Sequence, residues 1–103
     1  MKFLTILFLK FLLISNFAMA EKIPTKSKIL KEASYCIKDS QAQVCRELIS
    51  EIEKLQLLVF DQNRFKCQSS LLGMQSAIIE AYFSKNFSNE RISFMVPYVI
   101  KNC

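Results

Sequence analysis

Four cysteines carry the clearest chemistry in this sequence: Cys36, Cys45, Cys67 and Cys103. An even number of cysteines in a small exported chain is typical of a disulfide framework. Zinc ligands usually come in cysteine pairs separated by about two to four residues, and even Cys36 and Cys45 are further apart than that. The sequence also lacks a Cys-x-x-Cys redox motif. We therefore expect structural disulfides, with no metal and no other cofactor.

The sequence contains no histidine, which removes several kinds of active site. A Ser-His-Asp triad, a Cys-His pair and a His-ligated metal all need that residue. Carboxylate pairs remain as acid–base groups, but we interpret Glu47 and Glu51, four residues apart, as the solvated side of a helix. Glu80 lies near an apolar helix face and is the acid to examine for burial. Because no pattern brings these acids together, we expect no enzymatic activity and no catalytic residue.

Basic and aromatic side chains are the candidates for binding. Lys28 and Lys31 belong to a basic N-terminal stretch that suits an anionic membrane surface or an acidic protein, although a solvated face explains it too. Phe83 and Phe87 flank Lys85 beside the last predicted loop, and together they would form a patch for a protein partner. No recognition motif accompanies the basic residues, so we expect no nucleic-acid partner.

The first twenty residues have the pattern of a secretory signal peptide. Lys2 precedes an apolar run over residues 3–14, and Ala18-Met19-Ala20 is a small-x-small cleavage site. This pattern predicts cleavage after Ala20 and a periplasmic or secreted protein. A retained membrane anchor is the alternative, but a membrane-spanning helix needs about 20 mostly apolar residues and the run contains Lys10.

Length and composition indicate one small folded domain. The chain has 103 residues, of which 51% are hydrophobic and 22% charged, with a formal net charge of +5. This composition excludes a collagen-like, low-complexity or wholly disordered chain. We expect a polar, extended leader over residues 21–26, which contains Pro24, and a folded domain over residues 27–103.

Apolar residues recur with a helical period through most of that domain. We predict Ser27 as the N-cap of the first helix, and Ser40 with Gln43 as a capping box at the second. Gly73 falls inside the third helix, where we expect close helix–helix approach rather than a kink. The first three helices are predicted at about 27–37, 40–60 and 64–84.

The fourth segment, at about 88–102, contains Pro97. Proline forbids a regular helix through its interior. We therefore expect either a helix that begins late, near Ser93, or two short pieces that meet at Pro97. The fold class predicted from all segments is all-α, a small up-and-down bundle of about four helices.

The order of the helices predicts how the cysteines pair. In an up-and-down bundle Cys36 and Cys45 lie at one end, and Cys67 and Cys103 lie at the other. A second helix of about 20 residues separates the two ends by about 30 Å. A disulfide needs Cα atoms about 4.4–6.8 Å apart, so we predict Cys36–Cys45 and Cys67–Cys103.

The segment from Tyr35 to Tyr82 resembles uncharacterised small exported helical proteins of marine cyanobacteria. The resemblance rests on Cys36, Cys45, Leu55-Gln56, Cys67-Gln68 and Leu71-Leu72-Gly73. It implies an exported helical domain and supplies no catalytic residue.

The expected function is that of a non-enzymatic protein-interaction module held together by disulfides. Its partner would be another envelope or secreted protein, as for an inhibitor, an immunity protein or an envelope-assembly factor. The alternative is a membrane-surface protein that uses the basic first helix or a retained signal anchor.

Overall fold

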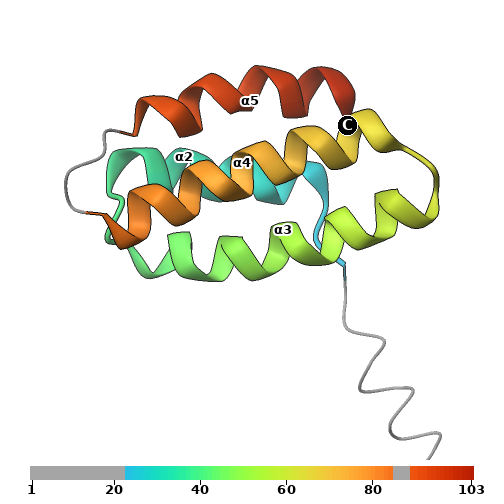
Figure 1. The fold of residues 1–103 in the computed structure, drawn as a ribbon. Helices are drawn as coiled ribbons and strands as arrows, with labels where there is room; N and C mark the ends of the chain where they lie inside the picture. Colours follow the sequence, from blue (N-terminus) through green and yellow to red (C-terminus); the bar gives the residue numbers. More distant parts are fainter. Residues whose placement is uncertain (1–22, 85–88) are drawn as a thin grey trace, which may run out of the picture.

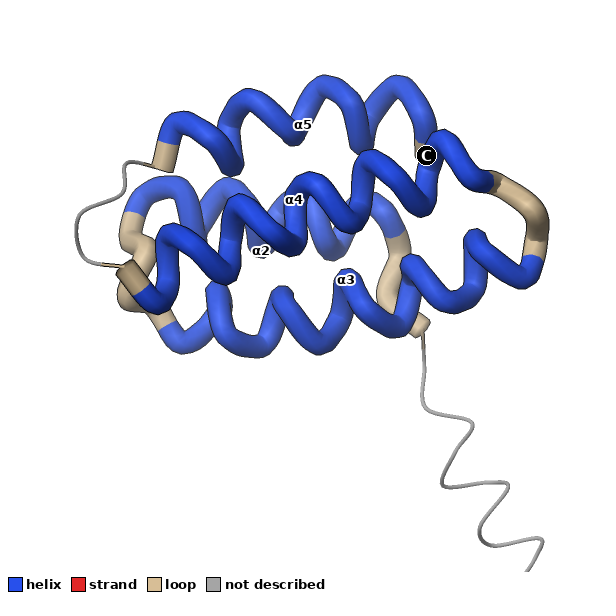
Figure 2. The backbone as a smooth tube through the Cα atoms, viewed as in Figure 1, coloured by secondary structure: helices blue, strands red, loops and turns tan. Residues whose placement is uncertain are grey.

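Four helices follow one another up and down in the computed structural model, which describes residues 23–84 and 89–103. They are labelled as in Figure 1, and their bounds are α2, Lys26–Lys38; α3, Gln43–Asp61; α4, Phe65–Phe83; and α5, Glu90–Asn102. The described chain contains helices joined by short turns and no strand (Figure 2). The all-α bundle with four helices is therefore confirmed. The predicted signal peptide lies outside the described residues.

The helices surround a single core. α3 packs against α2 and α4, and α5 also packs against α2 and α4. In Figure 1, α2 lies behind α4, with α3 and α5 on either side. This arrangement leaves each helix one face turned outward. The outward faces of α3 and α4 adjoin each other.

The core consists of apolar residues at helical spacing. In α3, one residue from each turn is buried on the same side, as the sequence pattern predicts. The largest fully buried apolar side chains are Ile29 of α2, Leu48, Ile52 and Val59 of α3, Leu71, Met74 and Ile78 of α4, and Ile92 and Val99 of α5.

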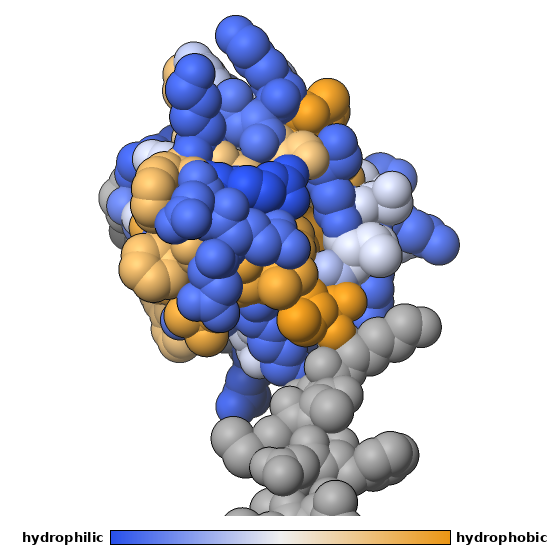
Figure 3. Space-filling model, turned by 90° about the vertical axis from the view of Figure 1, so that its right-hand side faces the viewer, coloured by the Kyte–Doolittle hydropathy of each residue, from blue (hydrophilic) through white to orange (hydrophobic). Residues whose placement is uncertain are grey.

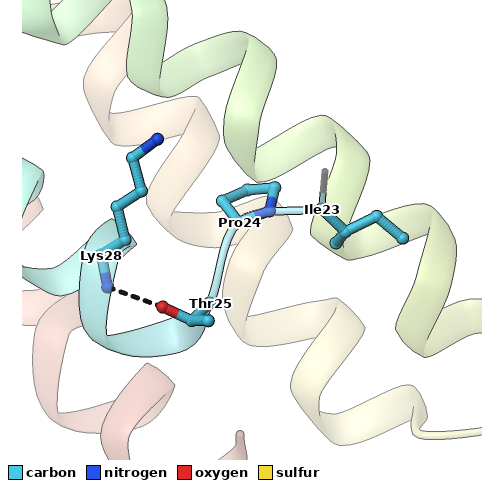
Figure 4. Close-up of a pocket in the computed structure, with 4 residues that line it drawn as sticks. All are labelled: Ile23, Pro24, Thr25 and Lys28. Carbon is cyan, nitrogen blue, oxygen red and sulfur yellow. Dashed lines mark hydrogen bonds between the residues drawn. The ribbon is translucent and has the colours of Figure 1, made fainter. Parts of the chain in front are cut away.

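Two predicted helix starts are wrong. α2 is capped by Thr25 and not by Ser27: the Thr25 Oγ1 atom accepts from the Lys28 backbone N–H at 3.2 Å (Figure 4). The helix thus begins at Lys26, so the non-helical leader ends at Thr25, one residue earlier than predicted. At α3 the N-cap is Ala42, and no side chain caps the helix. The predicted capping box of Ser40 with Gln43 is therefore absent.

Asp39 explains the late start of α3. Its side chain accepts from the Gln41 N–H at 3.0 Å, and its carbonyl accepts from the Ala42 N–H at 3.1 Å. An aspartate that bonds the backbone two residues ahead favours a turn over a helix. Residues 39–42 form that turn, and the helix begins after it.

The end of α3 lies close to the predicted end near residue 60. The helix ends at Asp61, and Asn63 adopts a positive φ of 59°. The Arg64 N–H donates to the Val59 carbonyl at 2.8 Å, and the Asn63 N–H donates to the Phe60 carbonyl at 3.0 Å. These two bonds make a Schellman motif with asparagine in the left-handed position, which turns the chain into α4.

The predicted break at Pro97 is wrong. α5 is one helix from Glu90 to Asn102, so it begins before Ser93 and continues through Pro97. Both Ser93 and Pro97 are exposed. The carbonyl that loses its helical donor therefore faces water, which can hydrogen-bond to it, and packing of Ile92 and Val99 holds the helix on the core.

Gly73 lies at a close contact between two helices. A Cβ atom built on it would lie 2.5 Å from the terminal methyl group of Met95 in α5. α4 is a single helix through this position. The contact agrees with the predicted close helix–helix approach.

Candidate functional site

The two predicted disulfides are present, one at each end of the bundle. Cys36 at the end of α2 is bonded to Cys45 at the start of α3, with Cα atoms 5.1 Å apart. Cys67 at the start of α4 is bonded to Cys103 after α5, with Cα atoms 4.7 Å apart. The cysteines therefore act as structural links, and none of the four is a free thiol.

The part of the chain that the structure describes contains neither a cluster of potential metal ligands nor a helix suited to span a membrane. Within residues 23–84 and 89–103, no group of three or more Cys, Asp or Glu side chains could hold a metal ion. No helix in these ranges is long and apolar enough to cross a membrane.

Glu51 does not lie on the solvated side of α3, contrary to prediction. Its side chain is 18% exposed and faces α2, where the Lys28 Nζ atom lies 3.1 Å from it. Lys28 also lies 3.9 Å from Glu32, one turn along α2. Glu32 and Glu51 are hydrogen-bonded to each other. The three side chains form a cluster that joins α2 to α3, which we call the clasp.

The two carboxyl groups of the clasp have pKa values shifted in opposite directions. Burial, together with the hydrogen bond and the charge of Glu51, raises the pKa of Glu32 to about 7. Burial alone would raise the pKa of Glu51 too, but the hydrogen bonds from Glu32 and Lys28 outweigh it and hold this pKa below its usual value. A hydrogen bond and the charge of Glu51 raise the pKa of Lys28. Protonated Glu32 thus donates to ionised Glu51.

The candidate acid Glu80, and also Glu53 on α3, have structural partners, whereas Glu47 is exposed. Glu80 is not deeply buried: it forms an ion pair with Arg91 at the start of α5. Glu53 accepts from the Gln75 amide at 3.0 Å, and the same amide donates to the Ile49 carbonyl at 3.0 Å. The ion pair of Glu80 joins α4 to α5, and the two hydrogen bonds of the Gln75 amide join α4 to α3.

Three of the residues predicted to bind a partner, Lys28, Lys31 and Phe83, lie in the described part of the chain. Lys28 belongs to the clasp, whereas Lys31, on the same helix, is exposed. Phe83 at the end of α4 is 74% exposed. Lys85 and Phe87 lie outside the described residues. Of the three described residues predicted to bind a partner, Phe83 is therefore the one that exposes a large apolar side chain to solvent.

Further exposed apolar side chains lie along α3 and α4 between Phe83 and the α3–α4 turn. We call this surface the outer face and define it by six exposed side chains: Leu57 and Phe60 of α3, and Phe65, Leu72, Ile79 and Phe83 of α4. Phe60 and Phe65 contact each other edge to face, with ring centroids 6.2 Å apart. Figure 3 looks onto the end of the bundle at the α3–α4 turn and shows hydrophobic surface beside polar side chains.

A groove of about 420 Å³ runs along part of the outer face. It lies between α3 and α4, and its walls include Ile49, Ile79 and Phe83. Arg46 and Glu53 line it from α3. The groove therefore has an apolar floor with one basic and one acidic group beside it.

Sequence reasoning missed this face although α4 carries a signal for it. Phe65, Leu72 and Ile79 recur every seven residues, and Phe83 follows one turn later. They occupy a different side of the helix from the buried Leu71, Met74 and Ile78, so α4 is apolar on two sides. The helical period predicts the apolar stripe that faces the core, and the second stripe was left out of that prediction.

Two other hollows contribute less. A pocket of about 190 Å³ at the start of α2 is lined by residues 23–25 and Lys28 (Figure 4). A shallow groove between α4 and α5 includes Lys66, Ser70 and Asn102, but the Asn102 amide already donates to the Ser70 hydroxyl at 2.8 Å. The outer face is therefore the best candidate functional site.

Comparison of the sequence and the structure with protein-family models, curated proteins and solved structures finds no match.

Proposed function

We propose that this chain is an exported, non-enzymatic interaction module that binds a protein through the outer face. The observation that carries the proposal is the second apolar stripe of α4. Phe65, Leu72, Ile79 and Phe83 lie in solvent while the opposite side of the same helix fills the core. Apolar side chains gathered in this way mark a protein-binding surface.

The chemistry of the acids supports binding over acid–base catalysis. Glu32 and Glu51 are held by Lys28 and by each other in the clasp, Glu53 accepts from Gln75, and Glu80 pairs with Arg91. Each of these carboxyl groups stabilises a helix–helix contact. The groove has an apolar floor, formed by Ile49, Ile79 and Phe83, that suits a protein surface.

Export is supported by the disulfides and by the N-terminal pattern. Two disulfides join the ends of the bundle, and such bonds form and persist in oxidising compartments. Residues 1–20 carry the charge, the apolar run and the cleavage site of a signal peptide.

The test is photo-crosslinking in intact host cells that express the full chain. A photoreactive amino acid replaces Leu72 on the outer face or, as the matched control, Ser93 on the exposed side of α5. We expect a discrete crosslinked protein band from position 72 and none from position 93. Equal labelling at the two positions, or no band from position 72, would overturn the proposal.

A further inference from the structure

The outer face has the apolar area of one half of a protein interface. With a fully exposed aromatic side chain contributing about 200 Å², its six side chains leave on the order of 600 Å² of apolar surface in solvent. This value lies at the upper end of apolar patches on monomers, which reach about 300–600 Å². A standard interface takes about 800 Å² from each partner, so a polar rim would complete it.

Charges beside the groove are arranged so that the face complements itself. Arg46 is exposed and forms no ion pair or side-chain hydrogen bond with any residue in 23–84 and 89–103. Glu53 lies two turns further along α3, about 10.5 Å away at 1.5 Å per residue. Ser50, a small side chain, lies between them and also lines the groove.

Antiparallel packing of two such helices gives Arg46 an acidic partner and adds a basic partner to Glu53, whose Oε2 atom also accepts from Gln75. If a two-fold axis crosses α3 between Ile49 and Ser50, Arg46 of each copy meets Glu53 of the other. A two-fold interface needs this reciprocity, because residue i contacts residue j and residue j contacts residue i. The small Ser50 allows the two helices to approach closely at the axis.

From the apolar area and the reciprocal charges, we infer that the outer face binds a second copy of this chain, with the two α3 helices antiparallel and crossing near Ser50. The inference rests on the proposed function, since it names the partner of the same face. In the pair, Ile79 lies nearer to the axis than Phe83, and both side chains lose their exposure to water. Ile49 packs with them.

Charge reversal tests this pairing, because it changes charge without removing apolar surface. The full mature chain and its variants Arg46→Glu and Glu53→Arg are compared by sedimentation equilibrium. We expect the unaltered chain to form dimers, and each single variant to dissociate at a concentration about tenfold higher or more, because like charges then face each other. Circular dichroism checks that the helices remain.

Mixing the two variants is the sharpest arm. In a mixed pair the introduced glutamate of the first variant meets the introduced arginine of the second, and the remaining native Arg46 and Glu53 meet each other, so both ion pairs are restored. We expect the equimolar mixture to form dimers at concentrations where each variant alone is monomeric. If the mixture stays monomeric, or the unaltered chain is a monomer at about 100 µM, the inference is overturned.

A crosslink locates the axis independently. Ser50→Cys with a short bismaleimide should give covalent dimers, whereas Ser93→Cys on α5 should not. If the chain is monomeric and position 72 still crosslinks to a different protein, the outer face does not bind a second copy. The proposed function, binding of a protein through this face, is then still supported. If position 72 crosslinks to nothing, the proposed function fails as well.

Discussion

Lys28 of α2 and Glu51 of α3 lie 3.1 Å apart across the interface between their helices. Glu32 joins them through its hydrogen bond to Glu51, so two carboxyl groups and one ammonium group meet at one place. The Oε2 atoms of both glutamates are buried and accept from no donor among the described residues. A proton on Glu32 supplies a donor between two groups that otherwise only accept.

The clasp makes folding depend on pH. The raised pKa of Glu32 contributes stability that is complete below about 4.5 and is lost as pH rises through about 7. The lowered pKa of Glu51 has the opposite effect, and its contribution is lost as pH falls below about 4.5. We therefore expect the greatest stability near pH 4.5, with most of the fall between about pH 4.5 and 7 and a total loss on the order of 1 kcal/mol by pH 8 after solvent screening.

Glu32→Gln should remove the loss at higher pH. The glutamine amide donates to Glu51 as protonated Glu32 does, but it cannot ionise. Urea unfolding should find the variant as stable as the unaltered chain at pH 5.5 and more stable at pH 8. Glu90→Gln, at an exposed position in the first turn of α5, is the control and should keep the original pH dependence between pH 5.5 and 8. Equal losses in both variants between these pH values would contradict the assignment.

Lys28→Ala should destabilise the protein more at pH 8 than at pH 5.5. At pH 8 the clasp carries two carboxylates, and Lys28 lies within ion-pair distance of them both. Lys31→Ala, on the same helix and exposed, serves as the matched control. Thermal unfolding followed by circular dichroism measures both. A similar shift of Tm for the two variants at pH 8 would show that Lys28 acts only through the net charge.

The two disulfides should differ in their contribution to stability. Cys36–Cys45 spans 9 residues and Cys67–Cys103 spans 36. The loss of chain entropy in the unfolded state predicts about 2.5 kcal/mol for the shorter loop and about 4 kcal/mol for the longer one. Paired cysteine-to-alanine variants, unfolded in urea, give the two values. A larger loss for the shorter loop would show that packing of the buried sulfur atoms dominates over the loop entropy.

Asn63→Ala should destabilise the turn between α3 and α4. Its φ of 59° lies in the left-handed region, where a residue with a Cβ atom is strained by about 1–2 kcal/mol and asparagine is tolerated better than most. We expect Asn63→Ala to lower the free energy of unfolding by about 1 kcal/mol, and Asn63→Gly to leave it equal or higher. If alanine and glycine behave alike, the residue does not hold this conformation in solution.

The positions of the helices and the cysteine pairing could be predicted because they depend on strong patterns. Apolar periodicity places Leu48 and Ile52 in the core, and helix order alone separates the two pairs of cysteines. Helix ends were harder, since Ser27 and Ser40 are both acceptable caps in isolation. The choice of Thr25 and of the Asp39 turn depends on hydrogen bonds that compete locally.

The continuous helix through Pro97 and the formation of the clasp could not be predicted from the sequence, because both depend on the tertiary structure. Proline prevents a helical hydrogen bond, but its effect depends on whether the freed carbonyl meets water, and the exposed position of Ser93 decides that. Glu51 looks solvated in the sequence because polar residues surround it. It becomes half-buried only because α2 crosses α3 at Lys28 and Glu32.

Hydroxyl-radical footprinting measures directly whether the outer face is covered by a partner. Phe83 on this face and Phe94 on α5 are both largely exposed in the single chain, at 74% and 65%. We predict that in the protein's native compartment Phe83 is labelled several-fold less than Phe94, and that dilution of the purified chain brings the two rates together. Equal labelling of both phenylalanines in the native compartment would show that nothing binds the outer face.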